Sequence, residues 1–305
     1  MNYAIKVSFI TINYNSSNYT IELIKSIEEH TSLEYEIIVV DNKSNEGDFL
    51  NLKSSIENKP RITLIKNNSN DGFSSGNMLG IKNAKAKYFF FINNDTQLLN
   101  DASSIMANYL DSHESVSLST ARISDQNGNF SSSYKLFPSL IKELLGNSIA
   151  RKVSRHKFPS NKVVPIKPTL VEVVTGSCMF FRAKDFISLG GLNESFFLYC
   201  EEEDISKRVW NQGKEVIFIP DAEVFHHGGG SSTNSFEMEA EYYISYNILI
   251  NQHFNKASVF LLKALLLFKL FRRIFKRKYG WSLFKLGLKN FPKEFSLRNK
   301  TSNNL

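Results

Sequence analysis

Residues 93–95, Asn-Asn-Asp, follow directly on the apolar run 88–92 and include residue types that bind metal ions. A carboxylate at the end of a buried strand can hold a divalent cation, with phosphate oxygens and water as further ligands. The alternative is an ordinary exit from a strand, because Asn and Asp are favoured turn formers. Asp95 is therefore a candidate ligand of a cation that neutralises a phosphate group.

A second candidate is the acidic run Glu201-Glu202-Glu203-Asp204, which lies between the aromatic residues 196–199 and a predicted helix. The helix dipole favours acidic side chains at this position, which explains one or two of them. Four adjacent carboxylates repel one another, and apolar neighbours raise the pKa of a carboxyl group. This combination suits a general base that deprotonates a hydroxyl group.

Two further segments are polar and rich in glycine. His226 opens the segment 226–232 after a predicted strand at 222–225, and its imidazole could complete a metal site or be structural. The loop 70–77 could hold a phosphate or ribose through its backbone N–H groups. It matches neither a Walker motif nor the glycine spacing of a dinucleotide-binding fold.

The elements that must position these residues alternate over the first 120 residues. Apolar, β-rich runs separated by helical patterns predict a mainly parallel α/β sheet flanked by helices. Polar loops then gather at the carboxyl ends of the strands, where ligands bind in such folds. The predicted strands are residues 6–12, 36–40, 62–65 and 88–92.

Beyond residue 122 this alternation ends. Residues 125–129 predict a hairpin turn, and four prolines within 138–168 predict a mobile or irregular insertion. Regular structure is expected again further on. The expected elements are strands at 171–174, 178–182 and 216–219, and a helix at 203–212.

The positive charge is concentrated near the carboxyl terminus. Residues 242–293 contain eleven of the 37 Lys and Arg and no acidic residue, so the rest has 26 basic against 30 acidic side chains. No recognition motif accompanies this charge, which argues against a nucleic-acid partner.

Lys263 and Lys269 interrupt residues 256–278 too early for a bilayer span. We expect a basic amphipathic helix that lies on a membrane surface through 256–293, or one that packs on the body or a partner subunit.

Taken together, these segments resemble the family 2 glycosyltransferases with the GT-A fold, especially the rhamnosyltransferase-like branch. The resemblance covers roughly residues 5–255. The segments that carry it are residues 10–15, 38–44, 70–80, 92–95, 175–182, 190–208 and 226–231.

The resemblance implies a role for each matching residue. Asp95 binds Mg²⁺ or Mn²⁺ together with His226, and Glu202, six residues before Arg208, is the catalytic base in a position where Asp is usual. Asn93 replaces the first acid of the family's Asp-x-Asp motif. The expected donor-binding residues are Thr11, Asn13, Asp41, Asp71, Gly76, Asn77, Asn93 and Asn94, and the expected acceptor-binding residues are Gly176, Glu201, Asp204 and Arg208.

The implied activity is an inverting transfer of a sugar from a nucleotide diphosphate donor, either dTDP-rhamnose or a UDP-hexose. The acceptor is a saccharide or a lipid-linked saccharide of bacterial surface polysaccharide synthesis. The rival hypothesis is a protein that has kept the fold and binds nucleotide sugars or acts as a scaffold without catalysis.

We expect a domain at 1–255, with a nucleotide-binding half (1–121) and an acceptor half (122–255), and a helical extension at 256–305. Cys178 and Cys200 are too few for a disulfide scaffold, and the first residues do not resemble a signal peptide. We therefore expect a cytoplasmic protein on the inner face of the cytoplasmic membrane, and a homo-oligomer is left open.

Overall fold

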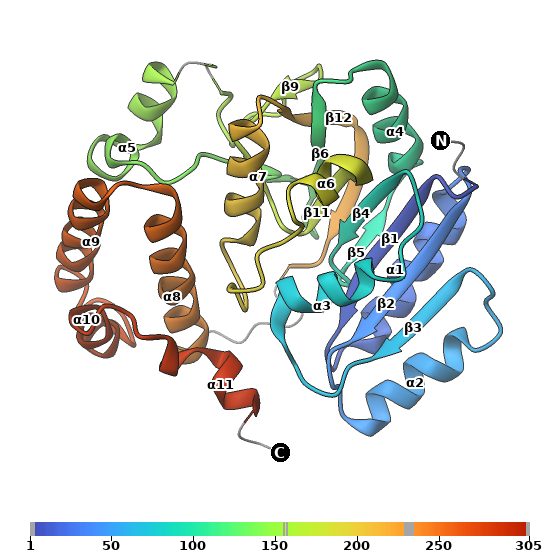
Figure 1. Ribbon diagram of the computed structural model, residues 1–305, viewed down its shortest axis with the longest axis horizontal. Helices are drawn as coiled ribbons and strands as arrows, with labels where there is room; N and C mark the ends of the chain where they lie inside the picture. The colour runs from blue at the N-terminus through green and yellow to red at the C-terminus, as the bar shows by residue number, and fades with distance from the viewer. Residues whose placement is uncertain (1–3, 155, 157, 229–234, 303–305) are drawn as a thin grey trace.

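The computed structural model describes residues 4–154, 156, 158–228 and 235–302. A large twisted sheet with helices on both faces occupies one side of the molecule (Figure 1). A group of helices made of α5 (Leu140–Val153), α8 (Phe236–His253), α9 (Lys256–Phe271) and α10 (Gly280–Leu288) lies on the other side. Helix α7 (Glu201–Asn211) stands between the two parts.

The large sheet is mixed, with a parallel amino-terminal half. Its strand order is β3-β2-β1-β4-β11-β6-β12-β5, in which β1 to β4 run parallel, β11 is antiparallel to both neighbours, and β12 is parallel to β6. Its strands are β1 (Val7–Asn13), β2 (Tyr35–Asp41), β3 (Ile62–Lys66), β4 (Tyr88–Ile92), β5 (Thr96–Leu98), β6 (Val116–Ser124), β11 (Cys178–Arg182) and β12 (Glu215–His226), with β7 (Phe130–Ser131) and β9 (Thr169–Leu170) at its margins.

Helices cover both faces of this sheet. Helices α1 (Ser17–His30), α2 (Glu46–Ile56) and α4 (Ala102–Ser112) contribute to one apolar core, and α3 (Gly72–Ile81), α6 (Ala183–Ser188) and α7 contribute to the other. Alternate residues of each strand point to opposite cores: Phe9 and Phe90 to the first, Ile10 and Phe91 to the second. The remaining elements are a small sheet of β8 (Tyr134–Lys135) and β10 (Val173–Val174), the 3₁₀ turn η1 (Lys293–Phe295) and α11 (Leu297–Ser302).

The expected α/β architecture is confirmed, with one local correction. The strands at 88–92 and 178–182 have the bounds that we expected, and residues 125–129 form the hairpin turn. The insertion is not irregular throughout, because helix α5 forms within it, capped by Ser139 and kinked at Gly146, where φ is +83°.

The expected helix through 256–293 is divided into α10 and, before it, α9, which ends at Phe271. It begins after Asn255, whose side-chain oxygen accepts a hydrogen bond from the backbone N–H of Ser258 (2.9 Å). Its residues Val259 and Leu262 are buried in a core shared with α8, and Leu270 is buried in a second core that joins α8 to α10. None of the described helices combines the length and apolar character that a bilayer span requires.

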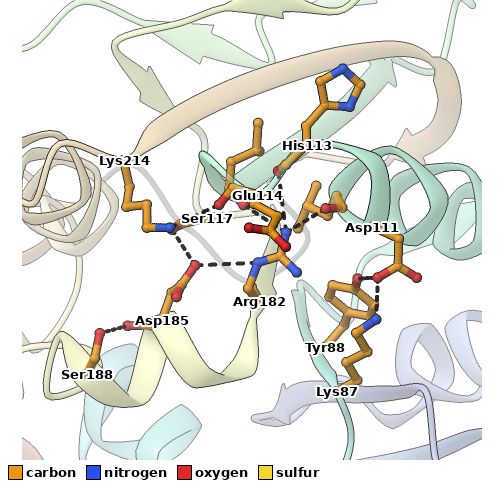
Figure 2. Close-up of polar contacts among 12 residues, drawn as sticks. Lys87, Tyr88, Asp111, His113, Glu114, Ser117, Arg182, Asp185, Ser188 and Lys214 are labelled. Atoms are coloured by element: carbon orange, nitrogen blue, oxygen red, sulfur yellow. Dashed lines mark hydrogen bonds and ion pairs between the residues drawn. The ribbon is translucent and has the colours of Figure 1, made fainter.

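Arg182, the last residue of β11, lies within a network of polar contacts (Figure 2). Its buried guanidinium donates a hydrogen bond to the carbonyl of Leu110 (2.5 Å) and lies 3.5 Å from a carboxylate oxygen of Asp185. The hydroxyl of Ser117 donates to the same Asp185 oxygen (2.6 Å). Because β11 is antiparallel to β4, Arg182 lies opposite Tyr88, at the start of β4 and away from residues 93–95. Arg182 thus joins α4, β6 and α6 at the base of the sheet.

We expect Arg182→Met to lower the free energy of unfolding by about 3 kcal/mol, because the Asp185 charge would stay buried without its partner. Denaturant unfolding measures the loss. The matched control is Arg122→Met, which breaks the exposed pair with Glu223 and should cost less than about 1 kcal/mol. Equal losses in the two variants would contradict a special role for Arg182.

Candidate active site

Two polar loops meet at the carboxyl end of β4. The first residue of β11, Cys178, pairs with the last residue of β4, Ile92, so the turn before β11 lies beside residues 93–95. The backbone N–H of Asn93 donates a hydrogen bond to the carbonyl of Ser177 (3.1 Å). The structure thereby joins the strand-end segment that contains Asp95 to the turn that contains Gly176.

Asp95 and His226, which we call the strand-end pair, come together as the sequence predicted. Nε2 of His226 lies 3.1 Å from Oδ1 of Asp95, and the backbone N–H of His227 donates to the carbonyl of Asp95 (2.9 Å). The pairing of β12 with β5, which places His226 opposite Thr96, produces this contact across 131 residues. Residues 229–232 of the predicted glycine segment lie outside the described residues.

The strand-end pair fits a divalent cation such as Mg²⁺ or Mn²⁺. It offers a carboxylate oxygen and an imidazole nitrogen, and Mn²⁺ in particular accepts both. Within the described ranges, no group of three or more His, Cys, Asp or Glu side chains has the spacing of metal ligands. A cation here would therefore need ligands from substrate oxygens and water, as Mg²⁺ commonly has in phosphate sites.

Asn13 and Asp41 lie side by side at the ends of β1 and β2. Nδ2 of Asn13 donates to Oδ2 of Asp41 (2.8 Å) and lies equally near Oδ2 of Asp48, while Oδ1 of Asn13 accepts from Thr20 (2.8 Å). Both side chains are fully buried, so Asn13 orients Asp41 rather than facing solvent. The hydroxyl of Thr11 is buried and has no hydrogen-bond partner within the part of the chain that the structure describes.

Three of the predicted donor residues are buried and serve local packing. Nδ2 of Asn94 donates to the hydroxyl of Ser16 (2.7 Å) and to that of Thr20 (3.0 Å), which fixes the segment 93–95 to α1. Asn77 donates to the carbonyl of Phe73 within α3 (3.0 Å). A Cβ at Gly76 would lie only 2.8 Å from Asn42, so glycine allows α3 to approach the sheet.

Asp71 has the same kind of local partners at the start of α3. Its carboxylate accepts hydrogen bonds from the side chains of Asn67 (2.9 Å) and Ser69 (2.8 Å), and it remains partly exposed. The next residue, Gly72, has φ of +83°, and its carbonyl oxygen accepts a hydrogen bond from Nδ2 of Asn42 (3.0 Å). The loop is therefore held in one conformation, with Asp71 at its surface.

The acidic run begins helix α7 and forms what we call the carboxylate cluster, Glu201, Glu202 and Glu203. A Cβ at Gly176 would lie 3.8 Å from Oε2 of Glu202 and 3.9 Å from Oε1 of Glu201, so the turn at Gly176 faces two of these carboxylates. Nζ of Lys135 lies 2.7 Å from Glu202 and 2.6 Å from Glu203. Each carboxylate of the cluster also has a buried Oε2 without a hydrogen-bond partner among the described residues.

Burial dominates the electrostatics of this cluster. It raises the pKa of Glu201 well above its usual value, and the Glu202 charge adds to the effect. Burial and then the Glu202 charge raise the pKa of Glu203 to about 7, although Lys135 opposes the change. Burial lowers the pKa of Lys135, but Glu202 and Glu203 outweigh it, so that pKa lies well above its ordinary value. Lys135 is therefore a fixed cation beside Glu202.

Asp204 and Arg208 form a clamp that positions α7. Oδ2 of Asp204 accepts from Nη2 of Arg208 (2.6 Å) and Oδ1 lies 2.7 Å from Nε2 of His253 on α8. Arg208 also donates to the carbonyl of Leu189 (2.8 Å). The clamp thereby holds the first turn of α7, with its carboxylate cluster, in one orientation relative to α8.

Sequence reasoning missed Lys135 and His253. Lys135 is 67 residues from Glu202 and His253 is 49 residues from Asp204, and neither belongs to a local motif. Tyr199 and Cys200 were also missed as special positions. Their φ angles of 72° and 68° are unusual for residues with side chains, and they direct the chain into α7.

Residues 8–190 match the profile of glycosyl transferase family 2. The chain belongs to this family. Among family members, rhamnosyltransferase WbbL of Escherichia coli K12 is 23% identical over 271 residues, which are 83% of this chain and 98% of WbbL. An N-acetylglucosaminyl-diphospho-decaprenol L-rhamnosyltransferase of Mycobacterium tuberculosis H37Rv is 28% identical over 137 residues, 43% of this chain and 44% of that enzyme. The resemblance to this family is thus confirmed.

Solved structures of glycosyltransferases have the same fold. GalNAc-T7 with UDP, GalNAc and Mn²⁺ superposes with a TM-score of 0.64 at 15% identity, covering 96% of this chain and 56% of GalNAc-T7. Residues 1–349 of Staphylococcus aureus TarS with UDP give a TM-score of 0.56 at 17% identity, covering 95% of this chain and 82% of that one. These likenesses confirm the GT-A fold of this family 2 member.

We expect the stability of the protein to fall as pH rises through the titration of Glu203. Between about pH 4.5 and 7 the folded state keeps a proton that the unfolded chain has lost, so folding becomes less favourable with rising pH. Glu203→Gln should remove up to about 3 kcal/mol of this pH dependence, since one pKa unit corresponds to about 1.4 kcal/mol.

Denaturant unfolding at about pH 5 and about pH 8 measures this dependence. The control is Glu57→Gln, which removes an exposed carboxylate and should leave the difference between the two pH values unchanged. An equal pH dependence in the Glu203→Gln variant and the unmutated protein would contradict the raised pKa of Glu203.

Proposed function

We propose that this chain transfers a sugar from a nucleotide diphosphate donor to a saccharide or lipid-linked saccharide, with inversion at the anomeric carbon. The observation that carries this proposal is the contact between Asn93 and Ser177, which puts the strand-end pair beside the carboxylate cluster. The strand-end pair suits the leaving diphosphate, and the carboxylate cluster suits the attacking hydroxyl. Sugar transfer is the activity after which glycosyl transferase family 2, to which the chain belongs, is named.

The donor's base and ribose bind at the ends of β1 and β2 in this proposal. Asp41 accepts from the base or ribose, Asn13 orients it, and the unpartnered hydroxyl of Thr11 lies beneath them. Asp71 and the partly exposed Asn93 border the ribose and diphosphate. Three of the residues act indirectly. Gly76 and Asn77 fix α3, and Asn94 fixes the segment 93–95.

Asp95 and His226 hold Mg²⁺ or Mn²⁺ in the proposed donor complex. The bound cation would offset the negative charge of the diphosphate leaving group. The fixed strand-end pair and the buried first turn of α7 provide a site that needs little rearrangement during the reaction.

Glu202 is the proposed base. Lys135 binds its Oε1 and stabilises the carboxylate, which leaves Oε2 directed beside Gly176 to accept the proton of an acceptor hydroxyl. That oxygen forms the new bond to the anomeric carbon as the bond to the diphosphate breaks. We assign acceptor contacts to Gly176 and Glu201, and a positioning role to Asp204 and Arg208.

The proposed substrates follow from the relatives. Two of them are named rhamnosyltransferases, and one name specifies an N-acetylglucosaminyl-diphospho-decaprenol. GalNAc-T7 and TarS have been crystallised with UDP. We propose dTDP-rhamnose or a UDP-hexose as donor and a saccharide on a lipid diphosphate, in bacterial surface polysaccharide synthesis, as acceptor. Metal-dependent hydrolysis of a panel of nucleotide sugars identifies the donor.

Glu202→Gln should lower kcat about 10²-fold or more while donor affinity stays nearly unchanged, because the amide cannot accept the proton. Asp95→Ala is the matched comparison. It should abolish metal-dependent donor binding, and EDTA should inactivate the unmutated protein.

Steady-state transfer assays and calorimetric titration with the donor separate these effects. Full activity in EDTA would exclude the metal role. A larger loss of kcat in Glu203→Gln than in Glu202→Gln would move the base to Glu203. The absence of transfer and hydrolysis with every donor in the panel would favour a binding protein without catalysis.

We also propose that the outer face of α9 binds the cytoplasmic membrane surface. One face of α9 packs on α8. The opposite face exposes a stripe of phenylalanines that continues into the following turn as far as Phe275, which is 99% exposed. Leu144 and Leu145 of the neighbouring α5 are exposed as well. Such an apolar face bordered by cations suits the boundary between headgroups and acyl chains of an anionic bilayer. The exposed stripe consists of Phe260, Phe268, Phe271 and Phe275.

Replacing Phe271 and Phe275 together by Ser should weaken binding to anionic vesicles about tenfold or more, because burying each ring in the bilayer contributes roughly 1.5–3 kcal/mol. Vesicle co-sedimentation at low salt measures the change. The matched control replaces the exposed Leu50 and Leu99 of the other side by Ser and should bind normally. The proposal fails if the unmutated protein does not bind these vesicles.

A further inference from the structure

A cavity of about 800 Å³ lies between α8 and α9, outside the site described above. Tyrosines form one wall and the cations of α9 and the following turn form the other. We call it the tyrosine–arginine pocket, after Tyr199, Tyr242, Tyr246, Arg272, Arg273 and Lys276. We propose that it binds the phosphate-bearing part of the lipid-linked acceptor, a diphosphate ester, with the tyrosines against the attached sugar.

The first argument is charge. Two carboxylates border the pocket and each already has a cationic partner: Glu143 pairs with Lys269, and Glu239 lies 3.2 Å from Arg277. Throughout the described ranges, no carboxylate lies within ion-pair distance of Arg272, Arg273 or Lys276, and the residues outside them include no Asp or Glu. These three cations are exposed to solvent, and a doubly charged diphosphate would supply them with a counter-charge through charge-assisted hydrogen bonds.

The second argument is position. Tyr199 lines the pocket and is two residues before Glu201, so the pocket adjoins the carboxylate cluster. The ring of Tyr199 lies 5.9 Å from that of Tyr242, edge to face. Burial raises the pKa of Tyr242, and the nearby Cys200 and Glu203 raise it further, in keeping with this proximity. A sugar against these rings could present a hydroxyl to Glu202 while its phosphates reach the cations.

The third argument concerns the lipid chain. Leu262 and Leu266 of α9 form the apolar part of the pocket wall. The opposite face of the same helix exposes Phe268 and Phe271, which we propose to lie on the membrane. The helix that carries the pocket's cations thus also offers apolar side chains to a lipid chain, Leu262 and Leu266 inside the pocket and Phe268 and Phe271 on its outer face. The inference rests on the proposed function for the identity of this ligand.

Binding of farnesyl diphosphate, a soluble prenyl diphosphate, tests the pocket directly. Isothermal titration is done with saturating UDP or dTDP and Mg²⁺, so that the donor site is filled. Arg273→Gln combined with Lys276→Gln should weaken binding about tenfold or more, because charge-assisted hydrogen bonds to phosphate are lost. Inorganic pyrophosphate should lose affinity in the same variant, and farnesol should bind neither protein.

The matched control replaces Lys285 and Lys289 by Gln, which removes the same charge from exposed positions within and directly after α10, outside the pocket. It should bind farnesyl diphosphate within about twofold of the unmutated protein. Equal affinity in the pocket variant and the control would overturn the proposal. If phosphatidylglycerol vesicles, and not farnesyl diphosphate, lose affinity in the pocket variant, the cations bind phospholipid headgroups and the proposal is wrong.

Donor hydrolysis separates this inference from the proposed function. The pocket variant should hydrolyse the donor at the unmutated rate and show a raised KM for the lipid-linked acceptor. Normal hydrolysis with unchanged farnesyl diphosphate binding would overturn the pocket alone. In another outcome the unmutated protein hydrolyses none of the donors, while farnesyl diphosphate still binds and loses affinity in the pocket variant. This outcome would overturn the catalytic proposal and leave the pocket as a diphosphate site.

Discussion

Strand β11 runs antiparallel to β4, so its first residue, Cys178, lies opposite the last residue of β4, Ile92. This pairing brings the turn at Gly176 to the same sheet edge as Asp95, although the two are far apart in sequence. A parallel β11 would have put Arg182 there and moved the turn to the base of the sheet. The closeness of the segment with Asp95 to the turn at Gly176 therefore depends on the direction of this strand.

The carboxylate cluster needs electrostatic stabilisation, because burying several acidic side chains side by side is unfavourable. The amino-terminal end of α7 and the cation of Lys135 supply part of it. Protonation supplies more, as the raised pKa values of Glu201 and Glu203 indicate. The left-handed backbone at Tyr199 and Cys200 adds strain of order 1 kcal/mol each. Such strain is retained where the surroundings fix the conformation, and here the Asp204–Arg208–His253 clamp does so.

The sequence predicted the parts of the site that follow from local pattern. Asp95 and His226 could be placed because each follows a β-rich run, and strands end at a common sheet edge. Lys135 could not, because an isolated lysine has no pattern and its partners are 67 and 68 residues away. Helix α5 was missed because its apolar residues, such as Leu144 and Leu145, face outward rather than into a core. The four prolines of its surroundings concealed the helical spacing further.

Helix α9 carries apolar residues all round, and this explains why its sequence left two interpretations open. Val259 and Leu262 face α8, as in a packing helix, while Phe268 and Phe271 are exposed, as in a membrane-binding helix. The first interpretation accounts for the inner face of α9, and the second stays a proposal for its outer face. Because its inner face closes the core beside α8, α9 also fixes how far any membrane contact lies from Glu202. An acceptor anchored in that membrane would therefore reach the carboxylate cluster along the cationic end of α9. A flexible tail in place of α9 would not fix this path.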